Sequence, residues 1–266
     1  MRTMRLPPLF VAFALAAVCA AQSQQVRDRT LAEAIDRVMK TGLFWGFDEK
    51  ALSRGGDAGA VVTTRILADR ELTDAEVGTL SGTTESCFRR LTWVWQAADR
   101  EPRTALLLLR YLDYQARSPE LKTWIAQAKK EILERYAASP ADPMAAAGRG
   151  ASDIALEGAI DRVMKDGHLA GRDPEPLRGA GDAGAVVLTR LLADRTLTDE
   201  EIATAVVALD ECFYDPRRVD APSDRHPSTT LFLLRYFDFQ ARSADLRKAI
   251  AGTRKVIVER CAAFAE

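Results

Sequence analysis

An internal repeat with a constant offset of 125 residues is the strongest constraint on how this chain of 266 residues folds. GDAGAVVTTRILADRELTDAE begins at Gly56, and GDAGAVVLTRLLADRTLTDEE begins at Gly181. The same register relates LAEAIDRVMKTG at Leu31 to LEGAIDRVMKDG at Leu156, and LLLLRYLDYQARS at Leu106 to LFLLRYFDFQARS at Leu231. From Leu31 to the C-terminus no gap is needed, and roughly half of the aligned positions are identical. This self-similarity predicts a tandem duplication of one unit.

The repeat sets the predicted domain boundaries. Two copies are fewer than an open solenoid needs, and each copy is long enough to enclose its own core. The segment between them is rich in Ala, Gly and Pro and has no apolar period, as in a linker. The predicted organisation is a signal peptide over 1–21, copy one over 26–138, a linker over 139–153 and copy two over 154–266.

Each copy shows the apolar periodicity of helices and no useful period-2 strand pattern. In copy one the predicted helices span 30–41, 57–70, from 73 onward, 102–117 and 118–138. Their starts carry helix-capping residues: Asp57 as an N-cap, Thr73 and Glu76 as a capping box, and Ser118 before Pro119. The predicted fold class is all-α, with an about five-helix bundle unit that occurs twice, either as two bundles or as one continuous helical array.

The N-terminus has the layout of a secretory signal peptide. Arg2 and Arg5 form a basic region, Leu9–Val18 is continuously apolar, and small residues follow. The apolar run is shorter than the roughly 20 residues that a membrane-spanning helix needs. We expect cleavage near Ala20 or Ala21 and a secreted or periplasmic mature chain with no transmembrane segment. A lipoprotein anchored at Cys19 is a less favoured alternative, because Val18 is bulkier than the residue that usually precedes a lipidated cysteine.

Charge and composition exclude several function classes. The formal net charge is -1, so no positive field attracts nucleic acid. The two histidines, His168 and His226, both lie in predicted loops of copy two, so no histidine-dependent chemistry is shared by the copies. The glycine-rich stretch 53–62 lacks the lysine and hydroxyl of a phosphate loop, and Gly59 and Gly184 are better explained by close helix packing. We therefore expect no cofactor, no metal and no catalytic residue set, although the sequence leaves enzymatic activity open.

Three cysteines remain after signal cleavage, and an exported chain can form disulfides. Cys87 and Cys212 occupy equivalent positions, whereas Cys261 aligns with Tyr136. A bridge between Cys212 and Cys261 is the favoured pairing, because both lie on predicted helices of copy two. Buried free thiols are the alternative.

The copies differ most in their aromatic residues. All four tryptophans lie in copy one, and the residues aligned with them in copy two are small or charged: Trp45, Trp93, Trp95 and Trp124 against Ala170, Arg218, Asp220 and Ala249. A shared fold does not place Arg and Asp where a large ring is buried, so Trp93 and Trp95 are expected at accessible loop positions. Exposed loop aromatics often mark contact surfaces. The predicted binding surface consists of Phe44, Trp45, Phe47, Trp93 and Trp95. The alternatives are that these rings pack against copy two or fold back on copy one.

A charge ladder recurs on the most apolar helix of each copy. The residues are spaced three and four apart, which places them on one helix face: Arg110, Asp113 and Arg117 in copy one, and Arg235, Asp238 and Arg242 in copy two. A structural ion network is the simpler explanation, because unpaired charges in a core are costly. An acid–base or anion site is the alternative.

The sequence favours an exported, non-enzymatic helical binding or scaffold protein that contacts a protein, peptide or glycan through the aromatic surface of copy one. The alternative is a hydrolase or lyase that uses the Asp and Arg residues of the ladder in a groove between the copies.

Overall fold

The computed structural model describes residues 8–44, 46–67, 70–139, 151–168, 174–193 and 195–262. Side chains are described from residue 24 in the first helix, from 154 in α7 and from 175 in α8. Throughout these residues the regular secondary structure is helical and no strand occurs, which confirms the all-α prediction. We refer to residues 8–139 as the first half and to residues 151–262 as the second half.

The first half begins with a long helix and continues with shorter ones. Its elements are α1 (Pro8–Thr41), α2 (Gly46–Leu52), α3 (Asp57–Leu67), α4 (Asp74–Cys87), η1 (Leu91–Trp93), η2 (Ala97–Arg100), α5 (Arg103–Gln115) and α6 (Pro119–Ala137).

The second half follows the same order. Its elements are α7 (Ala151–Asp166), α8 (Pro174–Arg178), α9 (Asp182–Leu192), α10 (Asp199–Cys212), η4 (Pro216–Arg218), η5 (Pro222–Arg225), α11 (Ser228–Gln240) and α12 (Ala244–Ala262). From α3 onward each element of the first half has a counterpart whose bounds lie 125 residues later. The helix α7 begins within the segment predicted as a linker, whose residues 140–150 lie outside the described part of the chain.

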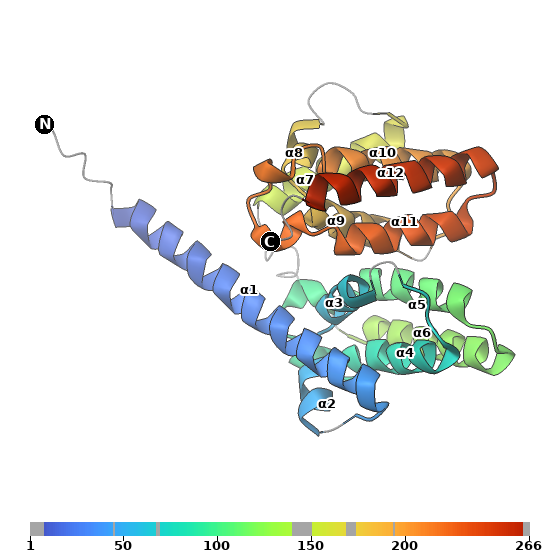
Figure 1. The fold of residues 1–266 in the computed structure, drawn as a ribbon. Coiled ribbons are helices and arrows are strands. Elements are labelled where there is room, and N and C mark those ends of the chain that lie inside the picture. Colours follow the sequence, from blue (N-terminus) through green and yellow to red (C-terminus); the bar gives the residue numbers. More distant parts are fainter. Residues whose placement is uncertain are drawn as a thin grey trace, which may run out of the picture.

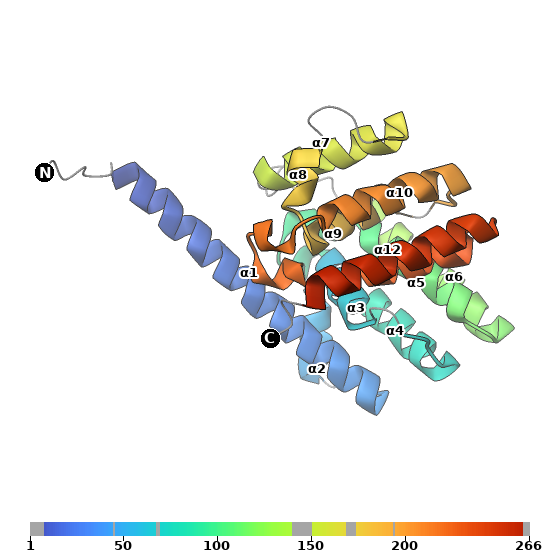
Figure 2. The ribbon, with the colours of Figure 1, turned by 45° about the horizontal axis from the view of Figure 1, so that its top comes forward.

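The helices stack in layers, with the two halves in direct contact (Figure 1). The helices α3 and α5 form the layer of the first half that faces the second half, and α9 and α11 face them from the other side. Across this boundary α3 packs against α11, and α5 packs against α9. The helices α4 and α6 lie on the outer side of the first half, and α2 packs against α1 and α4 (Figures 1 and 2). One buried apolar core contains residues of both halves.

The first helix is longer than predicted. It was expected to begin near residue 30, but α1 is continuous from Pro8 to Thr41 because no proline or glycine interrupts it after Pro8. Its N-terminal part extends away from the other helices (Figure 1). Within the described part of the chain, no helix is both long and apolar enough to cross a membrane. The signal peptide and its cleavage site stay predictions.

Two short helices, α2 and α8, were not predicted. Each spans fewer than two and a half turns, GFDEKAL in α2 and PEPLR in α8, and so carries too few residues for an apolar period. The predicted caps are confirmed elsewhere. The hydroxyl of Thr73 accepts from the N–H of Glu76 at 3.3 Å, and Thr198 repeats this capping box with Glu201 at 3.2 Å.

The close helix packing predicted at Gly59 and Gly184 is present. A Cβ atom on Gly59 would lie 2.5 Å from the sulfur of Cys87, and one on Gly184 would lie 2.3 Å from the sulfur of Cys212. The two thiols therefore fill the notches that the glycines leave, which brings α3 against α4 and α9 against α10.

We predict that Gly56→Ala lowers the free energy of unfolding by about 3 kcal/mol. Gly56 has a positive φ of 55°, and a Cβ there would lie 2.2 Å from the carbonyl oxygen of Asp99. Urea unfolding measures the loss. Gly42→Ala is the matched control, since Gly42 also has a positive φ but faces open space, and it should cost only about 1 kcal/mol. Equal losses for the two variants would contradict this account.

Candidate functional site

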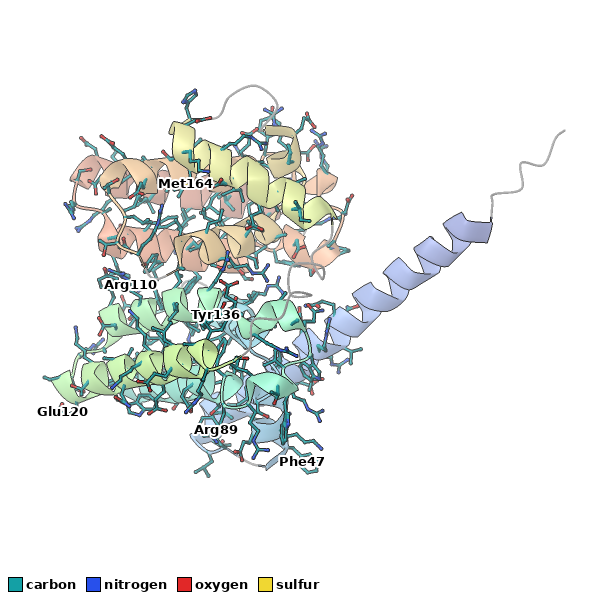
Figure 3. The ribbon with its side chains drawn as sticks, turned by 180° about the vertical axis from the view of Figure 1, so that it is seen from behind. Phe47, Arg89, Arg110, Glu120, Tyr136 and Met164 are labelled. Atoms are coloured by element: carbon teal, nitrogen blue, oxygen red, sulfur yellow. The ribbon has the colours of Figure 1, made fainter. Side chains whose placement is uncertain are left out.

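Three aromatic rings of the first half are exposed. Phe47 on α2 is 90% exposed, Phe44 just before it is 41% exposed, and Trp124 on α6 is 42% exposed. We call these three residues the aromatic surface. Figure 3 shows Phe47 at the end of the molecule that lies farthest from the second half.

Gly82 on α4 brings two of these rings together. A Cβ on Gly82 would lie 3.1 Å from the ring of Trp124 and 3.6 Å from the ring of Phe44, so both rings lie over this glycine. In the second half the equivalent residues are Val207 and Ala249, a larger residue beneath and a smaller one above. This exchange of sizes explains why a tryptophan can pack over α4 in the first half, whereas the second half has an alanine over a valine. The predicted surface did not include Trp124, because its position over Gly82 becomes visible only once α4 and α6 are paired.

The other predicted aromatics take different positions. Trp93 in η1 is 46% exposed, and the guanidinium of Arg90 lies 4.0 Å from its ring centroid. Trp95 is half-buried and packs against the apolar core that contains residues of both halves. Trp45 lies outside the described residues.

The charge ladder makes contacts between the halves. Arg110 on α5 donates to the hydroxyl of Thr196, and Arg235 on α11 lies 3.3 Å from Glu71. These contacts are equivalent, because Arg235 and Thr196 lie 125 residues after Arg110 and Glu71.

The structure does not gather the six ladder residues into one site. Arg117, Arg235 and Asp238 line a groove between the halves, whereas the lining does not include Arg110, Asp113 or Arg242. Asp113 is half-buried and Asp238 is exposed. Neither carboxylate therefore has the dry surroundings in which a general acid or base is usually tuned.

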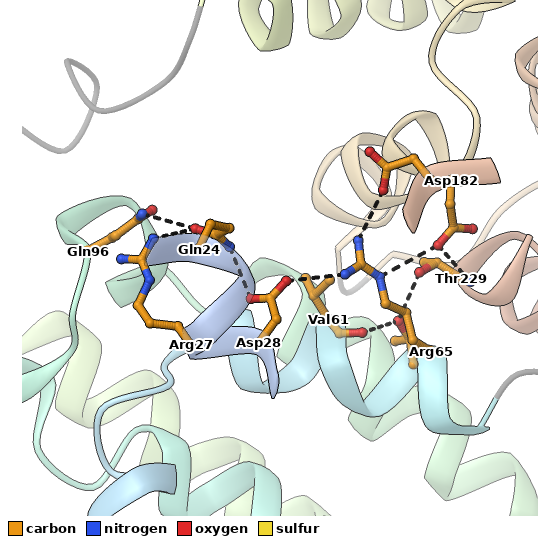
Figure 4. A network of polar contacts seen from close by, with 10 residues as sticks. Gln24, Arg27, Asp28, Val61, Arg65, Gln96, Asp182 and Thr229 are labelled. Carbon is orange, nitrogen blue, oxygen red and sulfur yellow. Dashed lines mark hydrogen bonds and ion pairs between the residues drawn. The ribbon is translucent and has the colours of Figure 1, made fainter. Parts of the chain in front are cut away.

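A buried acid–arginine arrangement connects the halves, and sequence reasoning missed it. Arg65 on α3 reaches three carboxylates: Asp28 at 3.4 Å, Asp224 at 3.6 Å and Asp182 at 3.7 Å (Figure 4). Arg190 on α9, the equivalent of Arg65, lies 4.0 Å from Asp57, the equivalent of Asp182. Each half thus extends an arginine to the carboxylate of the other.

Each carboxylate in this exchange also caps a helix. Asp57 was predicted to cap α3, but its Oδ1 accepts from the N–H of Ala105 at 2.9 Å, at the start of α5. Asp182 accepts from the N–H groups of Thr229 and Thr230 at the start of α11, at 3.1 and 2.9 Å. Asp57 therefore caps α5, whereas it was predicted to cap α3. The Asp of GDAGAVV and the Arg of the TR that follows it recur in both halves, but this repeat does not show that each Asp faces the Arg of the other half.

Burial raises the pKa of four carboxyl groups in and around this acid–arginine arrangement. It raises the pKa of Asp57 and of Asp182, against the opposing effect of the arginines and the backbone N–H groups. Asp99 in η2 has its pKa raised to about 7, first by burial and then by the nearby charge of Asp57, while Arg190 and Arg27 act in the opposite direction. Burial also raises the pKa of Asp28.

The predicted bridge between Cys212 and Cys261 is not formed in the structure. Cys87, Cys212 and Cys261 are all free and buried. The reason for Cys212 is local, since its sulfur packs into the notch at Gly184. Burial raises the pKa of the Cys87 and Cys212 thiols to about 12, so they are protonated and behave as small apolar groups.

The histidines lie at the surface. His168 and His226 are both exposed, and the ring of His168 contacts the carbonyl oxygen of Asp166 at 2.8 Å. Within the described ranges, no group of three or more His, Cys, Asp or Glu residues is arranged to hold a metal ion.

Comparison of the chain with protein-family models, with curated proteins and with solved structures finds no match. The functional argument therefore depends on the geometry alone.

We predict that Arg65→Met lowers the free energy of unfolding by about 3 kcal/mol, because it leaves the buried carboxylate of Asp182 without its arginine. The double variant Arg65→Met/Asp182→Asn should recover part of this loss, as measured by urea unfolding. Arg29→Met is the control, since Arg29 pairs with Glu33 at the surface and should change stability by less than about 1 kcal/mol. Strictly additive losses in the double variant would show that the pair is not coupled.

We also predict that stability falls as pH rises from about 4 to about 7 in part because of Asp99. A carboxyl whose pKa is raised on folding stabilises the fold while protonated, and this stabilisation is lost as pH rises through the folded pKa. Asp99→Asn should make the fall shallower by at most about 4 kcal/mol, since one pKa unit is worth about 1.4 kcal/mol. Urea unfolding at a series of pH values measures the slope. The exposed control Glu259→Gln should leave it unchanged, and an unaltered slope in the Asp99 variant would refute the assignment.

Proposed function

We propose that this chain is an exported, non-enzymatic helical binding protein whose first half contacts a protein partner through the aromatic surface. The observation that carries the proposal is the exposure of Phe47, Phe44 and Trp124 in the first half, where the rings of Phe44 and Trp124 meet over Gly82. Large exposed rings are rare on soluble surfaces unless they have a role, and aromatic residues are enriched among the residues that dominate binding energy. Export depends on the predicted signal peptide with cleavage near Ala20 or Ala21.

The difference between the halves supports a recognition role. Phe47 is replaced by Arg172 at the equivalent position of the second half, and Trp124 is replaced by Ala249. A scaffold that needed these rings for stability would need them in both halves. The rings that are confined to one half are therefore better explained by a contact that only this half makes.

We further propose that the chain arose by tandem duplication, after which the halves took different roles. The support is the constant offset of the sequence repeat together with the matching bounds of the helices. In this account the second half packs against the α3 and α5 layer of the first half. This packing supports the helices that carry the aromatic surface.

A hydrolase or lyase at the ladder residues has weaker support. Three of the six ladder residues line the groove between the halves, and one of these, Asp238, is exposed to water. Carboxylates in acid–base catalysis are generally held in drier surroundings that shift their pKa. Binding is accordingly the function that the geometry supports better.

We predict that Phe44→Ser/Phe47→Ser abolishes capture of the partner. The bait is the mature chain, used with native envelope and culture extracts, and the captured protein is then purified for affinity measurement by calorimetry. Loss of two exposed rings at the centre of a contact should weaken binding by at least about twentyfold. Phe47 is almost fully exposed, so its replacement should leave the fold intact, which circular dichroism checks.

Tyr214→Ser is the matched control. Tyr214 is an exposed aromatic residue of the second half, with the guanidinium of Arg178 4.5 Å from its ring centroid. This variant should bind the partner within about twofold of the unmodified chain. If the double variant retains the partner, or if Tyr214→Ser loses it equally, the aromatic surface is not the binding site.

A further inference from the structure

The turn between α1 and α2 projects from the first half and carries two exposed apolar side chains. Leu43 is 54% exposed and Phe47 is 90% exposed, and we call these two residues the tip. Figure 3 shows Phe47 at one end of the molecule. On both sides of the turn the backbone faces open space, since a Cβ atom on Gly42 or Gly46 would contact no other part of the described chain within 4 Å. The tip therefore stands out from the surface of the first half.

Local contacts hold the tip in this position. The N–H of Leu43 donates to the hydroxyl of Thr41 at 3.2 Å, which fixes the chain where α1 ends. In α2, Asp48 is buried and its Oδ1 accepts from the guanidinium of Arg37 at 2.7 and 2.9 Å. Neighbouring residues of a helix point about 100° apart. The inward direction of Asp48 therefore leaves the side chain of Phe47 free to point away from the body.

The fold does not need an apolar tip. Neither Leu43 nor Phe47 belongs to the apolar core, and Phe47 makes no ring contact within the described residues. In the second half the aligned residues are His168 and Arg172, so the equivalent turn carries polar side chains. The tip therefore keeps apolar area in water in one half only, which favours a contact outside the fold.

The charges of α2 favour an anionic surface. Its two carboxylates each pair with an arginine of another element, Asp48 with Arg37 at 2.7 Å and Glu49 with Arg89 at 2.8 Å. Lys50, the next residue of α2, is exposed and has no ion pair within the described part of the chain. The charge that α2 leaves uncompensated is therefore positive, and lysine side chains are attracted to anionic lipid headgroups.

A projecting tip fits a bilayer better than it fits a protein. The residues that dominate protein interfaces lie in packed surfaces whose rim excludes water. Phe44 and Trp124, whose rings meet over Gly82, form such a packed surface, whereas the ring of Phe47 stands alone. Aromatic and leucine side chains enter the boundary between headgroups and acyl chains without a complementary surface. The geometry of the tip therefore matches a lipid surface.

We propose that the tip inserts into the surface of a lipid bilayer. The side chains of Leu43 and Phe47 enter the headgroup region, and Lys50 faces anionic lipid. This contact goes beyond the protein contact proposed above, because Phe44 and Trp124 remain for the protein partner while the tip holds the chain at the lipid surface. It rests on the proposed function only in that an exported chain meets an envelope bilayer.

The test is co-sedimentation of the mature chain with vesicles of equal parts phosphatidylcholine and phosphatidylglycerol. The mature chain lacks the predicted signal peptide, so the apolar segment of that peptide does not contribute. We expect half of the chain to be bound at about 1 mM lipid, which is about tenfold weaker than the binding of one myristoyl chain. Absence of binding up to about 10 mM lipid overturns the proposal. Binding to phosphatidylcholine alone should be about fivefold weaker, and equal binding overturns the role given to Lys50.

Variants locate the contact. Leu43→Ser/Phe47→Ser should weaken vesicle binding by at least about tenfold, because the apolar area that enters the bilayer is removed. Both side chains are exposed, and circular dichroism checks that the fold is kept. Phe47→Trp should bind at least as tightly as the unmodified chain, since tryptophan favours the bilayer interface.

Val207→Ser/Tyr214→Ser is the matched control, because these two residues are exposed apolar side chains of the second half. It should change vesicle binding by less than about twofold. Equal losses in the two double variants, or no loss in the tip variant, overturn the assignment of the lipid contact to the tip.

Vesicles contain no protein, so this test and the capture experiment fail independently. Vesicle binding that requires the tip, in a chain that captures no protein, supports the lipid contact and removes the proposed protein contact. Capture of a protein by a chain that does not bind vesicles overturns the lipid contact and leaves the protein contact in place.

Discussion

The exchange of buried carboxylates and arginines between the halves is the constraint on which the rest of the structure depends. Asp57 and Asp182 each cap the helix of their own half and face an arginine of the other half. A buried carboxylate without such partners would destabilise the fold. Each half therefore depends on an arginine of the other half to stabilise its own capping carboxylate. The helices α3, α5, α9 and α11 therefore form one unit.

The other contacts across this boundary follow the same reciprocal pattern. The hydroxyls of Thr104 and Thr189 lie 3.0 Å apart, and those of Thr64 and Thr229 lie 3.4 Å apart. Since each residue of the second pair is equivalent to one of the first, the arrangement is that of an approximate twofold axis. Tyr114 and Phe239, which are equivalent to each other, stack where such an axis brings them together. A groove lined by residues of both halves lies beside this stacked pair.

The sequence predicted the features that local chemistry determines. The capping boxes at Thr73 and Thr198, the helical class and the glycine notches follow from neighbouring residues or from the repeat. It did not predict the cross-boundary role of Arg65 and Asp182, because the pairing of two halves is not encoded in the spacing within either one. The predicted disulfide was wrong for a related reason: the presence of two cysteines on helices of the same copy does not show whether their sulfurs face each other. For the candidate site, Phe44 and Phe47 were predicted to be exposed, whereas Trp124 depended on a size exchange with Gly82 that is visible only once α4 and α6 are paired.

The central claim is that both halves fold as one cooperative unit, which keeps the aromatic surface and the groove in fixed relation to a shared core. Differential scanning calorimetry of the chain tests it most directly. A single transition whose calorimetric enthalpy equals its van't Hoff enthalpy is the result that the shared core and the exchanged arginines predict. Two resolved transitions, or a calorimetric enthalpy about twice the van't Hoff value, would show that the halves unfold independently and would contradict the account.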